Sequence, residues 1–147
     1  MIQSEDIQIK TISLQDAENI RKLSGQLGYS ISLEDTQANI KQILALESHT
    51  ALVAISNDKI VGWIHAFETR TIESLPFIEL AGLVIDENAR GKGIGKILVE
   101  KIKQWCMKRN ISSLRVRSNV IRKDAHKFYL NLGFSEIKEQ KVFQMSL

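Results

Sequence analysis

The order of apolar and polar residues predicts one strand and two helices in the first third of the chain. Residues 6–12 alternate between apolar and polar positions, as a half-buried strand does. Residues 13–28 and 32–48 carry apolar residues at helical spacing, and each segment opens on a serine, Ser13 and Ser32. Serine is a favourable N-cap because its hydroxyl accepts a hydrogen bond from an N–H group of the first turn. We therefore expect two helices after the first strand.

Three apolar segments in the middle of the chain predict strands. Residues 50–56 and 59–68 flank a short polar sequence, which predicts a β-hairpin. After a polar loop, residues 77–85 are apolar apart from one acid, Glu79. A carboxylate within a buried strand is costly unless it has a partner or a function, so Glu79 is a candidate functional residue.

The last third of the sequence predicts two helices and two strands. A helical pattern begins at Ile94, and residues 112–118 have the pattern of a short strand. Residues 122–133 form a second helical pattern that ends in glycine, and residues 142–147 have the pattern of a final strand. The predicted order is β-α-α-β-β-β-α-β-α-β, which indicates a mixed sheet with helices packed on it.

The length of the chain fits one globular domain, and its net charge does not indicate a nucleic-acid-binding protein. The 147 residues are enough for a single domain, residues 1–147, with its own core. The net charge of +3, from 20 Lys and Arg against 17 Asp and Glu, is too small for a nucleic-acid-binding face. We therefore expect no nucleic-acid partner.

The sequence offers no membrane segment, disulfide or metal-ligand pattern. No apolar run approaches the roughly 20 residues that cross a bilayer, and the N-terminus lacks a signal-peptide pattern. The single cysteine, Cys106, excludes an intrachain disulfide and indicates a reducing compartment. His49, His65 and His126 lack metal-ligand spacing. We expect a cytoplasmic protein with no bound metal and no membrane partner.

A cluster of glycines and cations precedes the helix that begins at Ile94. Three of the chain's eight glycines fall within residues 91–95, and glycine inside a helix costs about 0.5–1 kcal/mol relative to alanine. The N-terminus of a helix presents unpaired N–H groups and a partial positive charge, so it binds anions. The absence of side chains lets a phosphate approach these groups, and Arg90, Lys92 and Lys96 add positive charge. A tight turn is the simpler alternative.

Two nucleotide-binding motifs fit this cluster less well. A P-loop requires Ser or Thr after its lysine, and neither follows Lys96. A dinucleotide-binding fold requires GxGxxG with an acid about 20 residues later. The spacing here is GxGxG, and residues 110–119 contain no acid.

These residues resemble the GNAT superfamily of N-acetyltransferases. The family motif [RQ]-x-x-G-x-[GA] is matched by Arg90, Gly93 and Gly95, and a second motif, A-x-x-[FL]-Y-x-x-x-G-F, is matched by residues 125–134. The resemblance extends over essentially the whole chain. It implies an α+β fold, with a mixed, mostly antiparallel sheet of six to seven strands and about four flanking helices.

The resemblance implies that acetyl-CoA is the co-substrate. Main-chain amides of the glycine segment would hold its pyrophosphate, with Arg90 at the rim. The backbone of the strand before it would follow the pantetheine arm, with an amide near Leu83 polarising the thioester carbonyl. Gly82 fits either a bulge in this strand or a crowded position that needs a small residue. The cofactor-binding residues implied are Leu83, Val84, Ile85, Arg90, Gly91, Lys92, Gly93, Ile94, Gly95 and Lys96.

The implied chemistry is direct transfer of the acetyl group to a primary amine of a small molecule or a protein. A lysine-type amine has a pKa of about 10.4, so its deprotonation at pH 7 costs roughly 4–5 kcal/mol. Glu79 falls where several relatives carry a catalytic glutamate and would act as the base, directly or through water. The alternatives are that Glu79 points to solvent, or that it pairs with Arg115 or Arg117 across the sheet.

The resemblance also assigns roles near the C-terminus. Tyr129 occupies the family's general-acid position and would protonate the departing thiolate, although a tyrosine beside Phe128 could also be a residue at the edge of the core. His126, on the same helix face, would contact the cofactor or Tyr129, or remain a surface residue.

One position departs from the family pattern. Many relatives carry an asparagine three residues before the alanine of the last helix, where it binds pantetheine, and this chain has Arg122 there. We expect Asn119 to make this contact instead, with Arg122 as a secondary contact.

The acceptor cannot be identified from the residues. His65 shares a strand face with Trp63 and Phe67 and either lines the acceptor pocket or fills the core. Acids that could attract a cationic amine, if they are not simply solvated, are Glu34, Asp35, Glu68 and Glu73. Cys106 is expected to be a small buried residue rather than a nucleophile. Dimers are frequent among relatives, so a homodimer stays open. The alternative functions are an acyl-CoA sensor without turnover, and nucleotide binding at the glycine segment.

Overall fold

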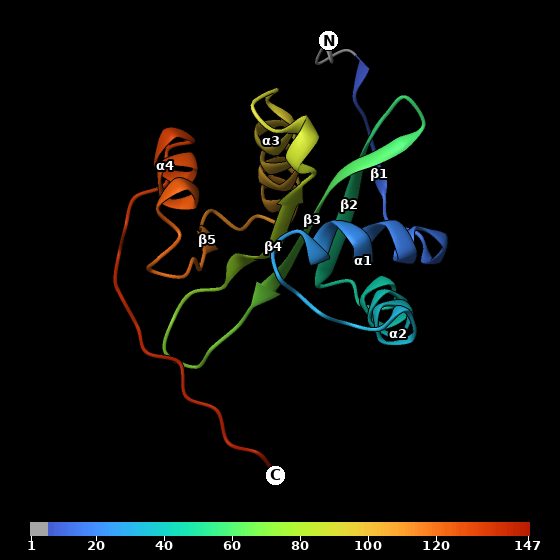
Figure 1. Cartoon of the computed structure of the whole chain (residues 1–147). Helices are drawn as coiled ribbons and strands as arrows, with labels where there is room; N and C mark the ends of the chain where they lie inside the picture. The colour runs from blue at the N-terminus through green and yellow to red at the C-terminus, as the bar shows by residue number, and fades with distance from the viewer. Residues whose placement is uncertain (1–5) are drawn as a thin grey trace. The chain divides into compact units, whose positions relative to one another are not determined.

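The computed structural model describes residues 6–147 and divides into two compact units (Figure 1). The larger unit is Met1–Arg117, and the smaller unit is Ser118–Leu147. Residues 1–5, which begin the stretch inspected for a targeting signal, lie outside the described residues. The two units are described separately below.

The larger unit contains a sheet in which the strands follow one another in sequence order, β1-β2-β3-β4-β5. Neighbouring strands from β1 to β4 are antiparallel, and β5 is parallel to β4. A mixed, mostly antiparallel sheet was predicted, and this is confirmed. The strands are β1 (Gln8–Thr11), β2 (His49–Ser56), β3 (Lys59–Thr69), β4 (Phe77–Ile85) and β5 (Leu114–Val116).

The predicted number of strands is wrong, because the described chain has five rather than six to seven. Residues 142–147, predicted as the last strand, form neither helix nor strand. Val142 and Phe143 are 85% and 88% exposed. A strand needs a hydrogen-bonding partner, and apolar composition predicts only the propensity to be one.

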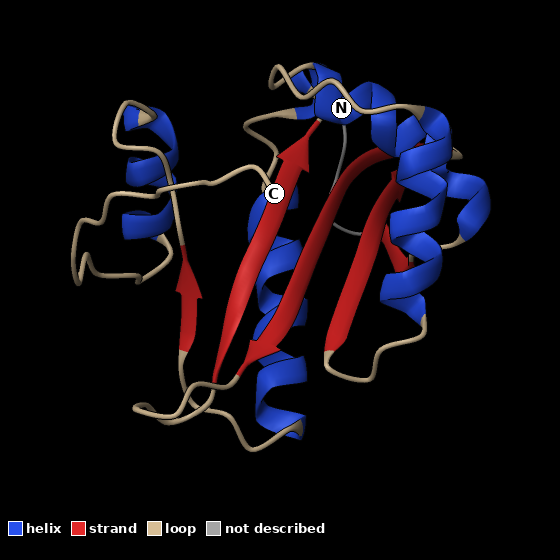
Figure 2. Ribbon diagram, turned by 90° about the horizontal axis from the view of Figure 1, so that it is seen from below, coloured by secondary structure: helices blue, strands red, loops and turns tan. Residues whose placement is uncertain are grey.

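Helices cover both faces of this sheet (Figure 2). Trp63 on β3 packs against the cluster that contains residues of α1 and α2, so this face of the sheet meets those helices. Gly62 points to the opposite face, where a Cβ atom would lie 3.5 Å from Leu98 Cδ1 of α3. The helices of the larger unit are α1 (Ala17–Gly25), α2 (Leu33–Leu44) and α3 (Ile94–Lys108).

Local side-chain contacts explain where the first two helices begin. At α2, Ser32 Oγ accepts a hydrogen bond from the Asp35 N–H group (3.0 Å), which confirms the predicted N-cap. Ahead of α1, both the N–H group and the hydroxyl of Ser13 donate to Asp16, and residues Leu14–Asp16 form a 3₁₀ turn, η2. The α-helix therefore begins later than the apolar pattern predicted.

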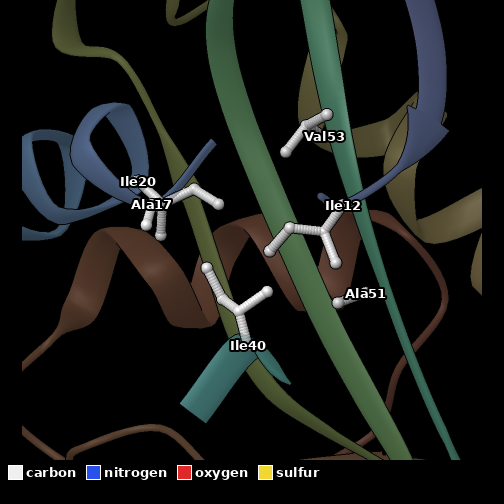
Figure 3. Packing of buried hydrophobic residues seen from close by; sticks show 6 residues of the cluster. All are labelled: Ile12, Ala17, Ile20, Ile40, Ala51 and Val53. Atoms are coloured by element: carbon white, nitrogen blue, oxygen red, sulfur yellow. The ribbon is translucent and has the colours of Figure 1, made fainter. Parts of the chain in front are cut away.

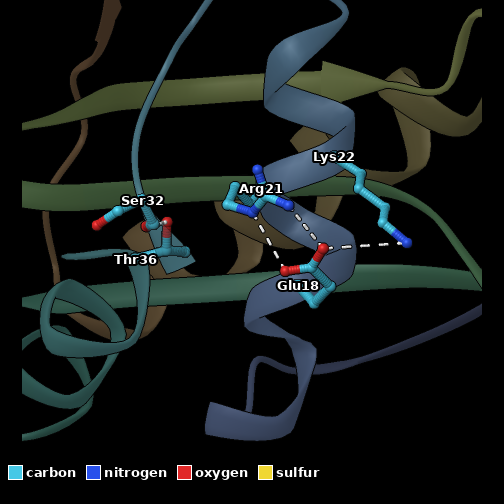
Figure 4. A network of polar contacts seen from close by, with 5 residues as sticks. All are labelled: Glu18, Arg21, Lys22, Ser32 and Thr36. Atoms are coloured by element: carbon cyan, nitrogen blue, oxygen red, sulfur yellow. Dashed lines mark hydrogen bonds and ion pairs between the residues drawn. The ribbon is translucent and has the colours of Figure 1, made fainter. Parts of the chain in front are cut away.

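Polar contacts within α1 and at the start of α2 also stabilise these helices (Figure 4). Within α1, Arg21 donates to Glu18 through two nitrogens, at 3.1 and 2.7 Å, and Lys22 lies 4.0 Å from the same carboxylate. In the first turn of α2, Thr36 Oγ1 donates to the Ser32 carbonyl (2.8 Å). Such contacts within one helix contribute a few tenths of a kcal/mol each, so packing of the inner faces dominates.

The core between α1, α2 and the sheet is aliphatic (Figure 3). Each of its residues is at most 7% exposed, and burial of each isoleucine or valine side chain stabilises the fold by about 1.5–3 kcal/mol. The cluster consists of Ile12, Ala17, Ile20, Ile40, Ala51 and Val53.

The smaller unit contains one helix, α4 (Lys123–Asn131). Gly133 follows it with φ +100°, and the Phe134 N–H group donates to the Tyr129 carbonyl (3.0 Å). This turn is a glycine helix stop, as the sequence predicted. The ring of Tyr129 makes edge contacts with Phe128 and Phe134, with ring centroids 5.2 and 5.5 Å apart.

Candidate functional site

The glycine segment connects β4 to α3 in a conformation that requires glycine. After β4, the 3₁₀ turn η3 (Glu87–Ala89) is capped by Asp86, whose carboxylate accepts from the Asn88 N–H group. Gly91 and Gly93 then have φ +78° and +81°, in the left-handed region that residues with a side chain rarely adopt. Gly93 is the N-cap of α3.

The main-chain amides of this segment are available to a ligand. Within the described residues, none of the N–H groups from Gly91 to Lys96 donates a hydrogen bond to another part of the chain. A Cβ atom at Gly91 or Gly93 would meet nothing within 4 Å, so both glycines border open space. Unpaired N–H groups at the start of a 15-residue helix attract negative charge. The segment can therefore bind an anion such as a phosphate.

The predicted cations lie on the surface beside these amides. Arg90 Nε donates to the Ile85 carbonyl (3.2 Å), and Lys92 Nζ donates to the Asn88 carbonyl (3.5 Å). Lys96 is exposed in the first turn of α3. Neither Arg90 nor Lys92 pairs with a carboxylate in the described chain, so their positive charge is not neutralised locally.

A β-bulge interrupts β4 at Ala81. On β3, Ala66 lies opposite Leu80 and His65 lies opposite Gly82, so Ala81 has no opposite residue. One extra residue reverses which main-chain groups of the following strand face β3.

Two hydrogen bonds fix the direction of the main chain on either side of the bulge. Before it, the Ile78 N–H group points away from β3 and donates to Ser113 (2.9 Å). After it, the Asp86 N–H group points towards β3 and donates to Val61 (2.8 Å). Because these directions alternate along an antiparallel pair, Val84 faces β3 whereas Leu83 and Ile85 face away from it.

The amide of Leu83 therefore lies on the open side of β4. The parallel strand β5 pairs with β4 only at Ile78, Glu79 and Leu80, so its pairing ends before Leu83. A molecule with carbonyl and amide groups can pair with this part of β4 as a strand would.

Gly82 meets a side chain from the neighbouring strand. A Cβ atom at this position would lie 2.6 Å from Cη2 of Trp63, which is closer than real contacts allow. The sequence left two explanations for Gly82, a bulge or crowding. The structure shows crowding at Gly82 itself, with the bulge one residue earlier.

Glu79 forms the ion pair that the sequence gave as an alternative to catalysis. Its Oε1 accepts from Arg117 Nε at 2.7 Å, and its side chain is 15% exposed. Arg115 lies opposite Glu79 in the register but places its guanidinium 4.0 Å from the centre of the Phe77 ring. Glu79 also lies opposite Phe67, on the face of the sheet that meets α1 and α2.

Tyr129 of the smaller unit has a phenol suited to donating a proton. Burial raises its pKa above the usual range, although the positive charge of Arg122 acts in the opposite direction. The phenol is therefore protonated at neutral pH.

Asn119 and Arg122 flank the start of α4. Asn119 Oδ1 accepts from the Ile121 N–H group (3.1 Å), and its main-chain carbonyl lies 2.9 Å from His126 Nε2. Arg122 is the N-cap residue of α4 and is exposed. The carbonyl oxygen of the Asn119 side chain is thus used in a turn, and its amide nitrogen remains for a ligand.

The four acids proposed to attract an amine differ in their surroundings. Glu68 is tied to Arg109 (2.7 Å) and Arg70 (2.8 Å), and the hydrogen bond from Arg109 is the main cause of the lowered pKa of its carboxyl group. Its charge is therefore already balanced. Glu34, Asp35 and Glu73 are exposed.

The structure reveals a histidine pair that sequence analysis missed. His49 Nδ1 and His65 Nε2 lie 2.9 Å apart, between β2 and β3. The hairpin register places Ala51 opposite His65 and His49 two residues along the same face. That register could have indicated the pair, but the sequence analysis treated His65 as a pocket or core residue and considered the two histidines together only as metal ligands.

Two further predictions concern Cys106 and bound metal. Cys106 is buried and its pKa is raised by burial, which disfavours the reactive thiolate, as expected for a core residue. In residues 6–147, no group of three or more His, Cys, Asp and Glu side chains could hold a metal ion. No helix in the same range is long and apolar enough to cross a membrane.

Known proteins with similar sequences are acetyltransferases. The aminoglycoside N(6′)-acetyltransferase type 1 of Serratia marcescens is 27% identical over 124 residues, which cover 79% of this chain and 83% of that protein. The N-acetylaspartate synthetase of Xenopus tropicalis is 35% identical over 85 residues, or 58% of this chain. The chain covers only 30% of that synthetase's length.

Solved structures share the fold at low sequence identity. The aminoglycoside N-acetyltransferase AAC(6′)-Iy in complex with CoA has a TM-score of 0.85 and 18% identity, over 96% of this chain and 95% of that chain. A transcriptional regulator from Bacillus halodurans has a TM-score of 0.84 and 21% identity, over 95% of this chain and 99% of that chain.

A family model describes the sequence features of a whole protein family, and one such model matches most of this chain. It matches residues 14–134, which begin at η2 and end at the turn after α4, and thus contain both glycine motifs. This chain therefore belongs to the acetyltransferase (GNAT) family.

Proposed function

We propose that the protein is an acetyl-CoA-dependent N-acetyltransferase, which moves an acetyl group directly to a primary amine in a ternary complex. The observation that carries this proposal is the run of six main-chain N–H groups, Gly91 to Lys96, that bond to nothing else in the described chain. A pyrophosphate supplies the acceptors that such a segment needs.

The local geometry fits the rest of the co-substrate. The open side of β4 at Leu83 and Ile85 offers main-chain groups to the amides of a pantetheine arm. Leu83 would direct its N–H group at the thioester carbonyl, and one such donor contributes about 2.7–4 kcal/mol to transition-state stabilisation. Asn119, with Arg122 in support, is the contact that we propose from the smaller unit.

Two residues carry the proposed proton transfers. Glu79 would attract the protonated amine and accept its proton, directly or through water, and the Arg117 ion pair would orient the carboxylate for this. Tyr129 would donate its proton to the sulfur of CoA as the carbon–sulfur bond breaks. Its raised pKa keeps that proton in place until then.

The acceptor that we propose is a small-molecule amine. The Serratia marcescens relative and the CoA-bound structural neighbour both carry names that specify aminoglycosides, and each alignment covers most of the chain. A protein amine is the alternative within the same reaction. Neither likeness distinguishes one small amine from another.

A sensor that binds acyl-CoA without turnover is the second candidate. One observation favours it, namely that Oε1 of Glu79 is already committed to Arg117. In this case the glycine segment would bind CoA while no amine is consumed.

Calorimetric titration with CoA, acetyl-CoA and ATP, followed by thiol release with a panel of amines, tests the proposal. We expect CoA and acetyl-CoA to bind, ATP to bind more weakly, and at least one amine to release thiol from acetyl-CoA. Binding of CoA without turnover on any amine would favour the sensor. Failure to bind CoA at millimolar concentration would overturn both candidates.

A further inference from the structure

We propose that the His65–His49 pair accepts the proton of the acceptor amine and conducts it to solvent. This inference rests on the proposed function and deepens it, because it names a proton path that the family resemblance did not supply. In this scheme Glu79 accepts the first proton of the incoming ammonium group, and the imidazole pair accepts the second proton during acetyl transfer.

The geometry of the pair is that of a relay. His49 begins β2 and His65 lies in β3, and their rings stack with centroids 5.2 Å apart while Nδ1 and Nε2 lie 2.9 Å apart. Phe67 stacks on His49 at 5.2 Å and holds its ring in place. A 2.9 Å contact between two ring nitrogens requires one to donate and the other to accept.

His65 connects this pair to a cavity of about 200 Å³ between α1, α2 and the sheet. Because its Nε2 is engaged by His49, its Nδ1 is the nitrogen that remains for a group in the cavity. The residues that line the cavity include Ser24, Thr36, Asn39, Trp63 and His65.

The cavity lies next to the part of β4 proposed to hold the thioester. His65 is opposite Gly82, the residue before Leu83, and both His65 and Gly82 are on the face that meets α1 and α2. Trp63 lines the cavity and also covers Gly82. An amine that enters beside these residues lies near both the imidazole and the proposed acetyl group.

Burial, without a neighbouring unpaired charge in the described chain, keeps the histidine pair neutral. No charged side chain lines the cavity, where α1 and α2 contribute aliphatic groups, Ser24, Thr36 and Asn39. On the same face of β4 and β5, Glu79 is paired with Arg117, and Arg115 stacks on Phe77. Burial, with a smaller contribution from His49, lowers the pKa of His65 to about 4, and burial also lowers that of His49. Both imidazoles are therefore free of an extra proton at pH 7.

The proposed transfer balances without another reactant. The ammonium group first gives one proton to Glu79, which releases it to water. The neutral amine nitrogen then forms a bond to the acetyl carbon and gives its second proton to His65 Nδ1. His65 passes its Nε2 proton to His49 Nδ1, and His49 releases its Nε2 proton to water. The carbon–sulfur bond breaks and its electron pair leaves with the CoA thiolate, which Tyr129 protonates, and the Tyr129 phenolate then regains a proton from water. Each imidazole ends neutral, in its other tautomer.

A weak base is sufficient for this step. The amine nitrogen becomes far more acidic as its lone pair forms the new carbon–nitrogen bond, so the proton then moves readily to an imidazole. General bases of this kind contribute about 10²–10⁴-fold in rate.

Three variants test the relay. His65→Gln keeps a polar side chain but cannot carry the proton onward, and we expect about 100-fold lower kcat with unchanged affinity for CoA. His49→Asn can still accept from His65 through its amide oxygen but cannot relay, so we expect an intermediate loss. Ile55→Val, a conservative change on β2 outside the cavity lining, is the matched control and is expected to keep the wild-type rate and pH profile.

Chemical rescue separates a proton path from a structural role. With His65→Ala, added imidazole is expected to restore kcat in proportion to its concentration, whereas it leaves Ile55→Val unchanged. Wild-type kcat in His65→Gln, or loss of rate in His65→Ala without rescue while the variant is folded by circular dichroism, would overturn the relay. Wild-type protein that binds no CoA or releases no thiol would instead overturn the proposed function itself.

Discussion

The indole ring of Trp63 on β3 covers Gly82 on β4 so closely that a Cβ atom at Gly82 would lie 2.6 Å from Trp63 Cη2. Gly82→Ala must displace the ring, and overpacking of this kind costs about 1–3 kcal/mol. We expect that loss in the free energy of unfolding measured by urea denaturation. Gly25→Ala is the control, because nothing lies within 4 Å of its added Cβ atom, and alanine is favoured in a helix. Equal stability of the two variants would contradict the packing argument.

Gly93→Ala separates backbone strain from ligand binding. Its φ of +81° disfavours alanine, and left-handed backbone costs a residue with a side chain roughly 1–2 kcal/mol. We expect that loss of stability together with at least about tenfold weaker CoA binding, which corresponds to about 1.4 kcal/mol, by calorimetry. Gly28→Ala has a comparable φ of +88° and no neighbour within 4 Å, so it should lose similar stability but keep its CoA affinity. If both variants bind CoA as the wild type does, the glycine segment is not the pyrophosphate site.

Glu79→Gln and Arg117→Gln distinguish the two roles of the ion pair. If the carboxylate handles the amine, Glu79→Gln should raise KM for the amine and lower kcat, whereas Arg117→Gln should leave most of the activity. The Glu79–Arg117 contact contributes little to stability, because the Arg117 side chain is 69% exposed. Steady-state kinetics provide the measurement. Equal activity of the two variants would reduce Glu79 to a structural partner.

Tyr129→Phe removes the proposed acid while keeping the aromatic contacts with Phe128 and Phe134. We expect kcat to fall about 100-fold with CoA affinity unchanged, since the phenol acts only as the thiolate leaves. Because burial raises the pKa of Tyr129, wild-type activity should persist to a higher pH than an ordinary phenol allows. Tyr29→Phe changes a 62% exposed tyrosine and should be silent in both assays.

The buried histidine should make folding sensitive to acid. The pKa of His65 falls from 6.5 to about 4 in the folded protein, so folding favours the neutral ring. Stability is then complete above the unfolded-state pKa of 6.5 and decreases as the pH falls towards 4, by up to about 3 kcal/mol. His65→Gln should lose less stability than the wild type between pH 7 and pH 4, by urea denaturation at each pH. A parallel decline in both proteins would show that other groups cause the acid sensitivity.

The sequence predicted the elements whose signal is local. Ser32 caps α2 as expected, Gly133 stops α4, and Gly93 begins α3. Each depends on the chemistry of a few neighbouring residues, which the sequence displays directly. The family motifs were equally local, and the family assignment is confirmed over residues 14–134.

Features that depend on pairing between residues far apart in the sequence were harder to predict from the sequence. The last predicted strand, residues 142–147, has strand composition but pairs with nothing in the described chain. The bulge at Ala81 arises from a one-residue mismatch between β3 and β4, which no pattern within either strand reveals. The choice between Arg115 and Arg117 as partner of Glu79 also depended on side-chain direction. The catalytic roles of Glu79 and Tyr129 stay predictions.

The bulge at Ala81 separates two parts of the same edge of β4, which have different hydrogen-bonding partners. Before the bulge, the main-chain groups of β4 that face away from β3 are paired with β5 and hold the sheet together. After the bulge, the main-chain groups of Leu83 and Ile85 face away from β3, and no strand of the described chain pairs with them. Deleting Ala81 would join Leu80 directly to Gly82 in a regular ladder, with Leu83 still opposite Ile64 and its amide still directed away from β3, so the direction of that amide is set by the pairing with β3 and survives the loss of the bulge.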